Sequence, residues 1–503
     1  MSLTQAIDYA AISPPLVIAV TALVVLVGDL FVPPGLRRAF AAATSIAGTA
    51  AALGATAWLA TTSARHTFCF SSGGCSYVVD DFTLFFQVLF LGSALVVLLL
   101  SVALFADRRI PTGEYHVLLL SSLAGMLVLA AARDLLTLLV ALEVVSLPAF
   151  VLVGLRRGDP RGGEAALKFF LFSVVSTALT VYGMALVYGV TGSIEFGHIA
   201  AALGQLRPHR GAMAATAAAG VVLVLVGFGF KVSAVPFHFW APDTYQGAPV
   251  PIAAFLSVAS KAAGFAGLIV LLLDAFRPYA DVWGPVLAVL AAVTMTVGNV
   301  VALRQWHLVR LLAWSTVAQA GYLLVPLGVA ATAHGRSDVV LAEAVRATLG
   351  YLGIYAAMNL GAFACAVMVS RRSPRGAITD VRGLVWSSPV VAVCFAFFLT
   401  ALAGLPPGVA GLFAKVVVLQ AAVHGHVTWL AIVAAVNTVI GLAYYLRVAA
   451  LMFAGPGDPE SARSARLRPD GAAAAAVALT AVLTVALSID PQPLLHAAGL
   501  ASH

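Results

Sequence analysis

The stretch GFGFKVSAVPFHFWAPDTYQGAPVP, Gly227–Pro251, decides how the chain folds. It places Lys231 and His238 in a run that is otherwise apolar enough to enter a membrane, and Gly227, Gly229 and Pro236 are expected to interrupt this run. A charged side chain at the centre of a membrane helix costs about 2.5–3.5 kcal/mol on insertion scales, and such residues usually face an ion or proton pathway. The stretch therefore predicts a broken membrane helix beside a functional site.

The composition of the whole chain also indicates a membrane protein. Of its 503 residues, 61% are hydrophobic and only 10% are charged, whereas a soluble domain carries roughly 25% charged residues. Apolar blocks of about 20 residues recur along the chain, which is the length that a helix needs to span a bilayer. We therefore expect an all-α integral membrane protein.

These apolar blocks predict about fourteen transmembrane helices. The seventh and the twelfth are interrupted by glycine and proline. The expected helices lie near residues 13–32, 39–60, 82–106, 115–132, 135–155, 166–190, 212–235, 250–273, 283–303, 309–330, 343–370, 388–413, 427–453 and 471–488.

The two interrupted helices suggest an internal repeat. LTALAGLPPGVAGLFAKVVVLQ, Leu399–Gln420, is broken by glycine and proline and carries Lys415, as the seventh helix carries Lys231. The breaks lie five helices apart, so helices 4–8 and 9–13 would run in opposite directions. Paired broken helices mark the ion pathway of inverted-repeat transporters. The expected divisions are 1–112 (helices 1–3), 113–274 (first repeat), 275–455 (second repeat) and 456–503 (helix 14 and tail).

The arginines are spread unevenly over the predicted loops. Most of them follow odd-numbered helices, so the positive-inside rule places these loops in the cytoplasm and both chain termini outside. Because the arginines are scattered among short loops, the net charge of +7 does not indicate nucleic-acid binding.

Lysine is scarce and is confined to the membrane. Of the 28 basic residues only four are lysines, and Lys168, Lys231, Lys261 and Lys415 all lie in or beside apolar helices. Arginine keeps its proton, whereas a desolvated lysine can release it, so the lysines are predicted to be stations for a proton. Two alternatives remain open: the ammonium of Lys168 could reach the membrane interface, and Lys231 and Lys415 could only stabilise the breaks.

Glu143, in DLLTLLVALEVVSLPAFVLVG, is the expected acidic partner. It lies about nine residues into its helix, roughly 13 Å deep at 1.5 Å per residue. Beside a lysine it would be ionised, and each group would control the protonation of the other. A purely structural ion pair is the alternative, although such pairs are seldom the most favourable way to hold helices together. His238 is a second relay candidate, with a structural histidine as its alternative.

Polar side chains on two further helices recur at helical spacing, so each set shares one face. We expect them to order water between the lysines, although hydrogen bonding between helices explains them equally well. The six candidates are Thr316, Gln319 and Tyr322 on one helix, and Tyr351, Tyr355 and Asn359 on the other.

The stretch that contains Lys231 also resembles a known family. FKVSAVPFHFWAPDTYQGAPVPIAAFLSVASKAAGF is similar to the central signature of the antiporter-like subunits of respiratory complex I, and its YQGAP run, Tyr245–Pro249, is closer to subunit N than to subunits L or M. VVDDFTLFFQVLFLGSALVVLLLS, EAALKFFLFSVVSTALTVYGMALVYG and LRQWHLVRLLAWSTVAQAGYLL are similar too, so the resemblance covers nearly all of the chain beyond about residue 78.

The resemblance implies two inverted five-helix repeats and redox-driven proton translocation. In the family a glutamate on helix 5 pairs with a lysine on helix 7, a central lysine follows on helix 8, and another lies on helix 12 in the exit half-channel. The matching residues here are Glu143, Lys231, Lys261 and Lys415, and Lys168 and His238 also match family positions.

The resemblance also implies the setting of the chain. It would be an enzyme only as a subunit of an NADH:quinone oxidoreductase. It would hold no cofactor itself, with NADH, FMN, iron–sulfur clusters and quinone in the assembled complex. Its expected partners are subunit M on one side, small membrane subunits on the other and the lipid bilayer of a bacterial plasma membrane, but no nucleic acid.

Other functions share this ancestry. A subunit of a multi-subunit sodium–proton antiporter is the main alternative, and a structural paralogue that does not pump is another. The chain also departs from the family pattern, because Val309-Arg310 stands where Lys-Arg is common, and Lys415 lies one residue farther from the proline pair than expected. The second departure leaves open which way Lys415 faces.

The four cysteines do not form a metal-site pattern. Cys365 and Cys394 lie in separate apolar helices and are expected to pack there. Cys69 and Cys75 flank a short loop on the predicted outer side, where a disulfide and two free thiols are equally plausible.

Overall fold

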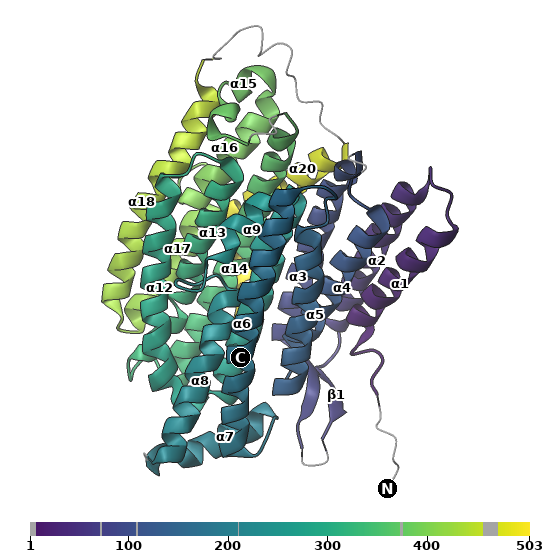
Figure 1. The fold of residues 1–503 in the computed structure, drawn as a ribbon. Coiled ribbons are helices and arrows are strands. Elements are labelled where there is room, and N and C mark those ends of the chain that lie inside the picture. Colours follow the sequence, from purple (N-terminus) through teal and green to yellow (C-terminus); the bar gives the residue numbers. More distant parts are fainter. Residues whose placement is uncertain are drawn as a thin grey trace.

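The computed structural model describes residues 7–70, 73–106, 109–209, 211–372, 376–455 and 471–502, and these form a bundle of helices that lie roughly side by side (Figure 1). The helices are α1 (Ser13–Phe31), α2 (Arg37–Leu59), α3 (Asp81–Ser101), α4 (Thr112–Ala131), α5 (Leu135–Val153), α6 (Pro160–Thr191), α7 (Phe196–Leu206), α8 (Ala212–Lys231), α9 (Trp240–Gly247), α10 (Val250–Phe255), α11 (Lys261–Val270), α12 (Ala280–Leu303), α13 (Leu308–Leu324), α14 (Asp338–Arg372), α15 (Leu384–Ser387), α16 (Pro389–Ala403), α17 (Ala410–His424), α18 (Thr428–Phe453), α20 (Gly471–Ile489) and α21 (Gln492–Leu500). Two strands, β1 (Arg65–Cys69) and β2 (Cys75–Val79), form a hairpin, and short 3-10 and π-helical turns lie between several of the helices.

The predicted all-α membrane fold is confirmed. Within the described residues, twelve helices are long and apolar enough to cross a membrane. The two other predicted segments also carry helices: α13 has 17 residues, α16 lies within the predicted twelfth helix, and α17 begins inside that range but continues to His424, beyond its expected end at residue 413.

Carboxylates begin several of these helices. The side chains of Asp80, Asp134, Asp159 and Glu195 accept hydrogen bonds from backbone N–H groups in the first turns of α3, α5, α6 and α7. These groups have no partner within the helix, and the helix dipole favours a negative charge beside them. Polar residues between apolar blocks therefore fix where each helix begins.

Both predicted breaks are present. α8 ends at Lys231 and α9 begins at Trp240, while α16 ends at Ala403 and α17 begins at Ala410. The expectation that Gly227 and Gly229 belong to the first break is wrong, because both lie inside α8.

The two glycines instead allow close packing. A Cβ at Gly227 would collide with the side chain of Thr180 on α6, and one at Gly229 would lie 2.8 Å from the ring of Phe237. Their lack of a side chain lets α6 and the unwound segment approach α8, so they serve contact between elements rather than helix breaking.

The centre of the bundle is formed by two helical segments that are buried almost all round. One is residues 250–275, which join α10 and α11 through π-helical turns at Leu256–Ser260 and Leu271–Ala275. The other is α14. A π-helical turn inside an α-helix often marks a functional site, and Lys261 directly follows the first one.

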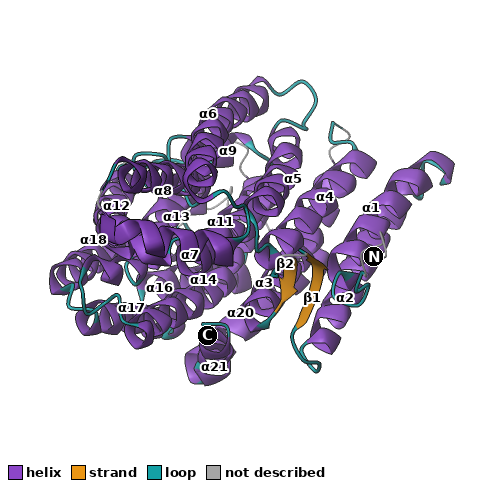
Figure 2. Cartoon of the chain, turned by 90° about the horizontal axis from the view of Figure 1, so that it is seen from below, coloured by secondary structure: helices purple, strands orange, loops and turns teal. Residues whose placement is uncertain are grey.

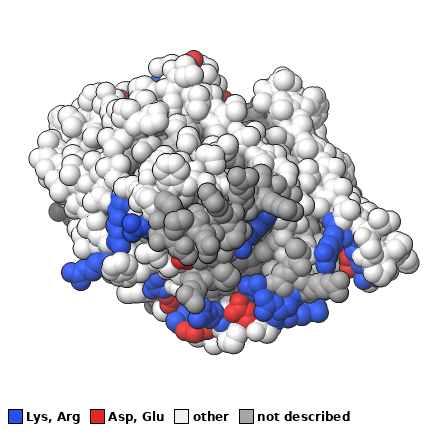
Figure 3. Space-filling model, turned by 90° about the horizontal axis from the view of Figure 1, so that it is seen from above, with Lys and Arg blue, Asp and Glu red and all other residues white. Residues whose placement is uncertain are grey.

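Several elements at one end of the bundle were not predicted. Figure 2 shows the β1–β2 hairpin, α7 and α21 at this end, and Asp8, near the start of the described chain, bonds the hairpin residues Thr67 and Arg65. In the hairpin Cys69 pairs with Cys75, and the two form a disulfide, which resolves the open question of the free thiols. At the opposite end, lysine and arginine side chains gather on the surface (Figure 3).

Candidate functional site

Lys231 lies at the last residue of α8, where the helix break begins. Its Nζ donates hydrogen bonds to Ser146 Oγ of α5 at 2.6 Å and to Ser173 Oγ of α6 at 3.4 Å. The C-terminal end of a helix favours a cation, and the two hydroxyls replace part of its hydration. The break thus places a half-buried ammonium between three helices.

Glu143 shares a small cavity with Lys231. The cavity is also lined by Thr177, Thr180 and Phe228, and its volume of about 10 Å³ is on the order of one water molecule. Glu143 Oε1 accepts a hydrogen bond from Thr177 Oγ1 at 2.8 Å. Among the described residues the predicted Glu143–Lys231 contact is not an ion pair, because each group bonds a hydroxyl instead.

Lys261 lies deeper and is 1% exposed. Its Nζ donates to the backbone carbonyl of Thr316 on α13 at 2.6 Å. One turn farther along α11, a Cβ on Gly264 would lie 3.1 Å from Lys231 Cβ. The helix that carries Lys261 therefore packs directly against Lys231.

Lys415 lies behind the second break and is 6% exposed. Its Nζ donates to the carbonyl of Ala403, the last residue of α16, at 2.7 Å and lies 5.4 Å from the ring centre of Tyr322. Helix ends leave carbonyls without an intrahelical donor, so the break itself supplies the acceptor. The open question of its orientation is resolved: Lys415 points back toward the break and into the bundle.

A cluster of buried hydroxyl and amide groups lies between α13, α14 and α18, and it includes Tyr322, which contacts Lys415. Gln319 Nε2 donates to Tyr445 Oη at 3.2 Å, Tyr351 Oη donates to Gln319 Oε1, and Ser315 Oγ and Tyr445 Oη are 2.5 Å apart. Tyr322 stacks on Tyr351. This cluster connects α13, whose Thr316 carbonyl accepts the hydrogen bond from Lys261, with the Tyr322 ring beside Lys415.

The other predicted stripe residues divide between two places. Tyr355 Oη donates to the carbonyl of Ser257 at 3.0 Å, and Asn359 Nδ2 donates to Ser257 Oγ at 2.8 Å. They therefore connect α14 to the π-helical turn before Lys261. The hydroxyl of Thr316 bonds within its own helix, so its contribution to the site is the carbonyl that Lys261 binds.

His238 lies in the first break and is 4% exposed. Its ring is 5.1 Å from that of Trp314 on α13. Five of the twelve buried polar side-chain atoms that have no hydrogen-bond partner among the described residues lie in and near this break. They are Ser233 Oγ, His238 Nδ1, Thr244 Oγ1, Tyr245 Oη and Trp314 Nε1.

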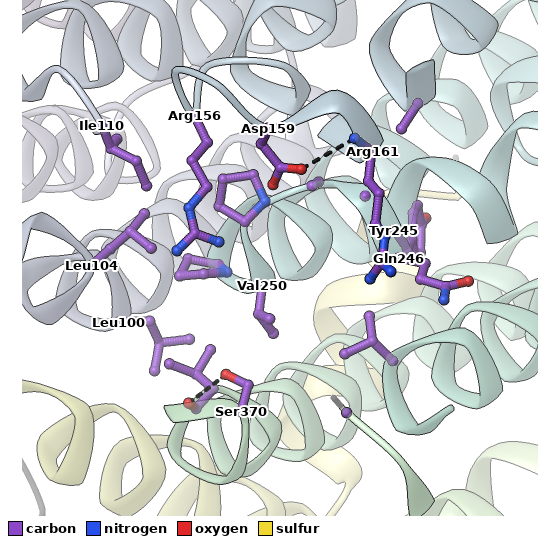
Figure 4. A pocket seen from close by; sticks show the side chains of 18 of the residues that line it. Leu100, Leu104, Ile110, Arg156, Asp159, Arg161, Tyr245, Gln246, Val250 and Ser370 are labelled. Atoms are coloured by element: carbon purple, nitrogen blue, oxygen red, sulfur yellow. Dashed lines mark hydrogen bonds between the residues drawn. The ribbon is translucent and has the colours of Figure 1, made fainter. Parts of the chain in front are cut away.

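Lys168 is placed apart from the other lysines. Its side chain is 42% exposed, and its Nζ forms ion pairs with Glu164 at 2.8 Å and Asp243 at 3.0 Å. Arg310 of α13 bonds the other oxygen of Asp243 at 2.6 Å. Lys168 therefore lines a large cavity at the basic end of the bundle (Figure 4) and helps to connect α6, α9 and α13.

Residues that the sequence analysis missed complete the site. Ser146 is one turn from Glu143, and Ser173 and Thr177 are one turn apart on α6. Helical spacing from Glu143 could have found Ser146, but no such spacing from a charged residue marked Ser173 or Thr177. Nothing in the sequence pattern pointed to Tyr445, or to the carbonyls that hold Lys261 and Lys415. In the described part of the chain no group of three or more His, Cys, Asp or Glu side chains could hold a metal ion.

Comparison with known proteins gives concordant matches. Residues 132–441 match the family model described as NADH:quinone oxidoreductase/Mrp antiporter, TM. The chain is 50% identical to NADH-quinone oxidoreductase subunit N 2 of Streptomyces griseus, covering 99% of this chain and 94% of that protein.

Solved structures agree on the fold. A chain of respiratory complex I from Thermus thermophilus is 31% identical, with a TM-score of 0.75, over 96% of this chain and 98% of that one. A chain of the Mrp complex from Dietzia sp. gives a TM-score of 0.82 at 22% identity, over 98% and 97% of the two chains, and so shows the fold alone. The chain therefore belongs to the membrane-subunit family of NADH:quinone oxidoreductases and Mrp antiporters, among the NADH-quinone oxidoreductase subunits N.

Proposed function

We propose that the chain is the proton-translocating subunit N of an NADH–quinone oxidoreductase, which moves protons across the membrane while quinone is reduced elsewhere in the complex. The observation that carries this proposal is the state of Lys261 and Lys415. Both are buried, and among the described residues each bonds a carbonyl rather than a carboxylate. A lysine held in this way can release its proton without breaking an ion pair.

The proposed route runs from Lys231 through Lys261 to Lys415. The packing of α11 on Lys231 supports the first step, and the cluster around Gln319 and Tyr445 supports the second. The buried polar atoms near the first break that have no partner among the described residues would be hydrogen-bonded by ordered water, and this makes His238 a candidate relay there. Lys168 would act at the entrance of the route, because its side chain is partly exposed and ion-paired.

Glu143 would act as the switch for Lys231. The ammonium bonds Ser146 and Ser173 in this structure, and the cavity that it shares with Glu143 gives it a second position beside the carboxylate. Moving between hydroxyls and a carboxylate changes how strongly the proton is held, so a local electrostatic change would drive proton release.

The rest of the proposal concerns the neighbouring subunits, the membrane and the division of the chain into repeats. NADH, FMN, iron–sulfur clusters and quinone would lie in other subunits, with subunit M on one side of this chain and small membrane subunits on the other. The complex would lie in a bacterial plasma membrane with both termini of this chain outside. The inverted repeats 113–274 and 275–455 would contain the two breaks, flanked by segments 1–112 and 456–503.

A subunit of a cation/proton antiporter is the second candidate. The likeness to the Mrp complex supports it at the level of the fold. The 50% identity to a subunit N over nearly the whole of both chains favours the first candidate.

Purifying the native complex with this chain and reconstituting it in vesicles tests the two against each other. The proposal predicts NADH oxidation by quinone that acidifies the vesicle lumen without a requirement for sodium. A complex that lacks flavin and iron–sulfur clusters and exchanges sodium for protons would contradict it.

A further inference from the structure

The two helix breaks contain backbone groups that a continuous helix would have satisfied. Where a helix starts or ends, several N–H and C=O groups have no partner within it. Inside a membrane each group left without a partner is costly, because lipid offers no hydrogen bond. Each break therefore needs an acceptor for every N–H group that it frees, and a helix that provides such an acceptor holds the break in its conformation.

In the first break, one N–H group depends on a side chain from another helix. Among residues 232–237, four N–H groups donate to nearby backbone carbonyls, and Pro236 has no N–H. The N–H of Val235 instead donates to Thr294 Oγ1 of α12 at 2.9 Å. Thr294 is 0% exposed, so this bond is shielded from solvent and lipid. Its hydroxyl thus holds the segment that follows Lys231.

The second break repeats this arrangement. Among residues 404–410, four N–H groups donate to carbonyls within the break or in the last turn of α16, and the two prolines have no N–H. The N–H of Ala410, the first residue of α17, donates to Ser488 Oγ of α20 at 3.1 Å. Ser488 Oγ in turn donates to the carbonyl of Thr484 at 2.8 Å. Its own helix therefore fixes the direction in which it accepts.

Both breaks shape the surroundings of a relay lysine. In the second break, a Cβ at Gly404 would lie 3.5 Å from Lys415 Nζ, and this Nζ bonds the carbonyl of Ala403, where the break starts. In the first break, Lys231 is itself the last residue of α8, four residues before Val235. A change in the conformation of either break would therefore move an ammonium group relative to its acceptors.

The two hydroxyls come from outside the helices that they hold. Thr294 lies in the proposed second repeat, 275–455, whereas its break lies in the first, and Ser488 lies in the segment that follows both repeats. A hydroxyl in a membrane helix can bond carbonyls of its own helix, as that of Thr480 on α20 does. The contact with a break is therefore an additional feature of Thr294 and Ser488.

We propose that Thr294 and Ser488 are positioning residues of the proton relay, each holding one break in the conformation that presents Lys231 or Lys415 to its acceptors. This role rests on the proposed function, and neither hydroxyl would carry the proton itself. Without the hydroxyl, a buried N–H group loses its acceptor, and the break relaxes until that group finds another. The lysine moves with the break and transfers its proton less efficiently.

The proton-to-electron ratio of the intact complex in sealed vesicles tests this proposal. Thr294→Val and Ser488→Ala remove the acceptors, and each should lower the ratio about fivefold, the factor by which one lost hydrogen bond shifts a two-state equilibrium. Thr294→Ser keeps the hydroxyl and should retain the wild-type ratio. Thr480→Val is the matched control, because Thr480 is also buried and its hydroxyl bonds its own helix. It should leave the ratio unchanged.

Native gels give the amount of assembled complex, so that the ratio refers to assembled complexes alone. A full ratio in Thr294→Val and Ser488→Ala, with or without less assembly, would show that the hydroxyls are only structural and would overturn the proposal. A loss in Thr294→Ser or Thr480→Val equal to that in Thr294→Val would overturn it as well. Should Thr294→Val fail to assemble, Ser488→Ala decides, because it removes a single oxygen atom from a half-buried side chain. Wild-type vesicles without redox-driven proton uptake would contradict the proposed function instead.

Discussion

At the scale of single residues, the lysines differ in what they contact. Lys231 bonds two hydroxyls, Lys261 and Lys415 bond carbonyls, and Lys168 bonds two carboxylates. Neutral acceptors leave a proton free to move, whereas carboxylates hold it in place. The contacts thus separate three relay candidates from one residue that connects elements.

Glu143→Gln tests the proposed switch. Glutamine still accepts the hydrogen bond from Thr177, but the charge near Lys231 is gone. In the proposed second position of Lys231, two unit charges about 4 Å apart would interact by about 4 kcal/mol at an effective dielectric constant of 20, so we expect proton pumping in vesicles to fall to below about a tenth. Thr177→Val, which removes only the hydrogen bond to Glu143, should lower proton pumping less than Glu143→Gln does. Equal pumping in wild type and Glu143→Gln would rule out the switch.

At the scale of elements, the helix breaks provide the groups that stabilise the ammonium groups of Lys231 and Lys415. The break at Lys231 ends α8 with a cation in its last turn, and the break at Ala403 frees the carbonyl that Lys415 binds. The sequence predicted both breaks from glycine and proline, yet it assigned Gly227 and Gly229 the wrong role. Which glycines break a helix and which allow packing depends on the neighbouring helix, and a single sequence does not contain that contact.

Gly227→Ala tests the packing role. Its new Cβ would collide with Thr180, so α6 and α8 must separate, and overpacking of this kind costs about 1–3 kcal/mol. We expect a lower melting temperature and less assembled complex on native gels. Gly189→Ala is the control. Gly189 lies on α6, the helix against which Gly227 packs, and its new Cβ would meet no atom within 4 Å, so this variant should be neutral or slightly stabilising. Similar losses in both variants would refute the packing role.

At the scale of the whole molecule, the hydrophobic blocks predicted the membrane helices well, because spanning a bilayer requires long apolar runs. The hairpin, α7 and α21 were missed, since short elements outside the membrane have no such requirement. Within the site, the side chains with rare chemistry were found from the sequence. Their partners were not, because backbone carbonyls carry no residue signature and Tyr445 comes from a distant helix.

The hairpin gives a test of how the molecule is oriented. If its end of the bundle faces outward, the Cys69–Cys75 disulfide lies outside the membrane. A membrane-impermeant maleimide should then label intact cells only after mild reduction, and the double variant Cys69→Ser/Cys75→Ser should remove that label. Labelling that requires inside-out vesicles would place the hairpin, and with it both termini, in the cytoplasm.

The proton-to-electron ratio of complexes that carry Lys261 variants in sealed vesicles tests the central claim most directly. Lys261→Ala removes the station and Lys261→Arg keeps the charge but cannot release a proton, so both complexes should assemble and translocate less than about a tenth of the protons. The control Arg346→Ala, which removes an exposed cation that bonds the carbonyl of Leu495, should retain the full ratio. A full ratio in Lys261→Ala, or its recovery in Lys261→Arg, would show that Lys261 is structural and would contradict the relay.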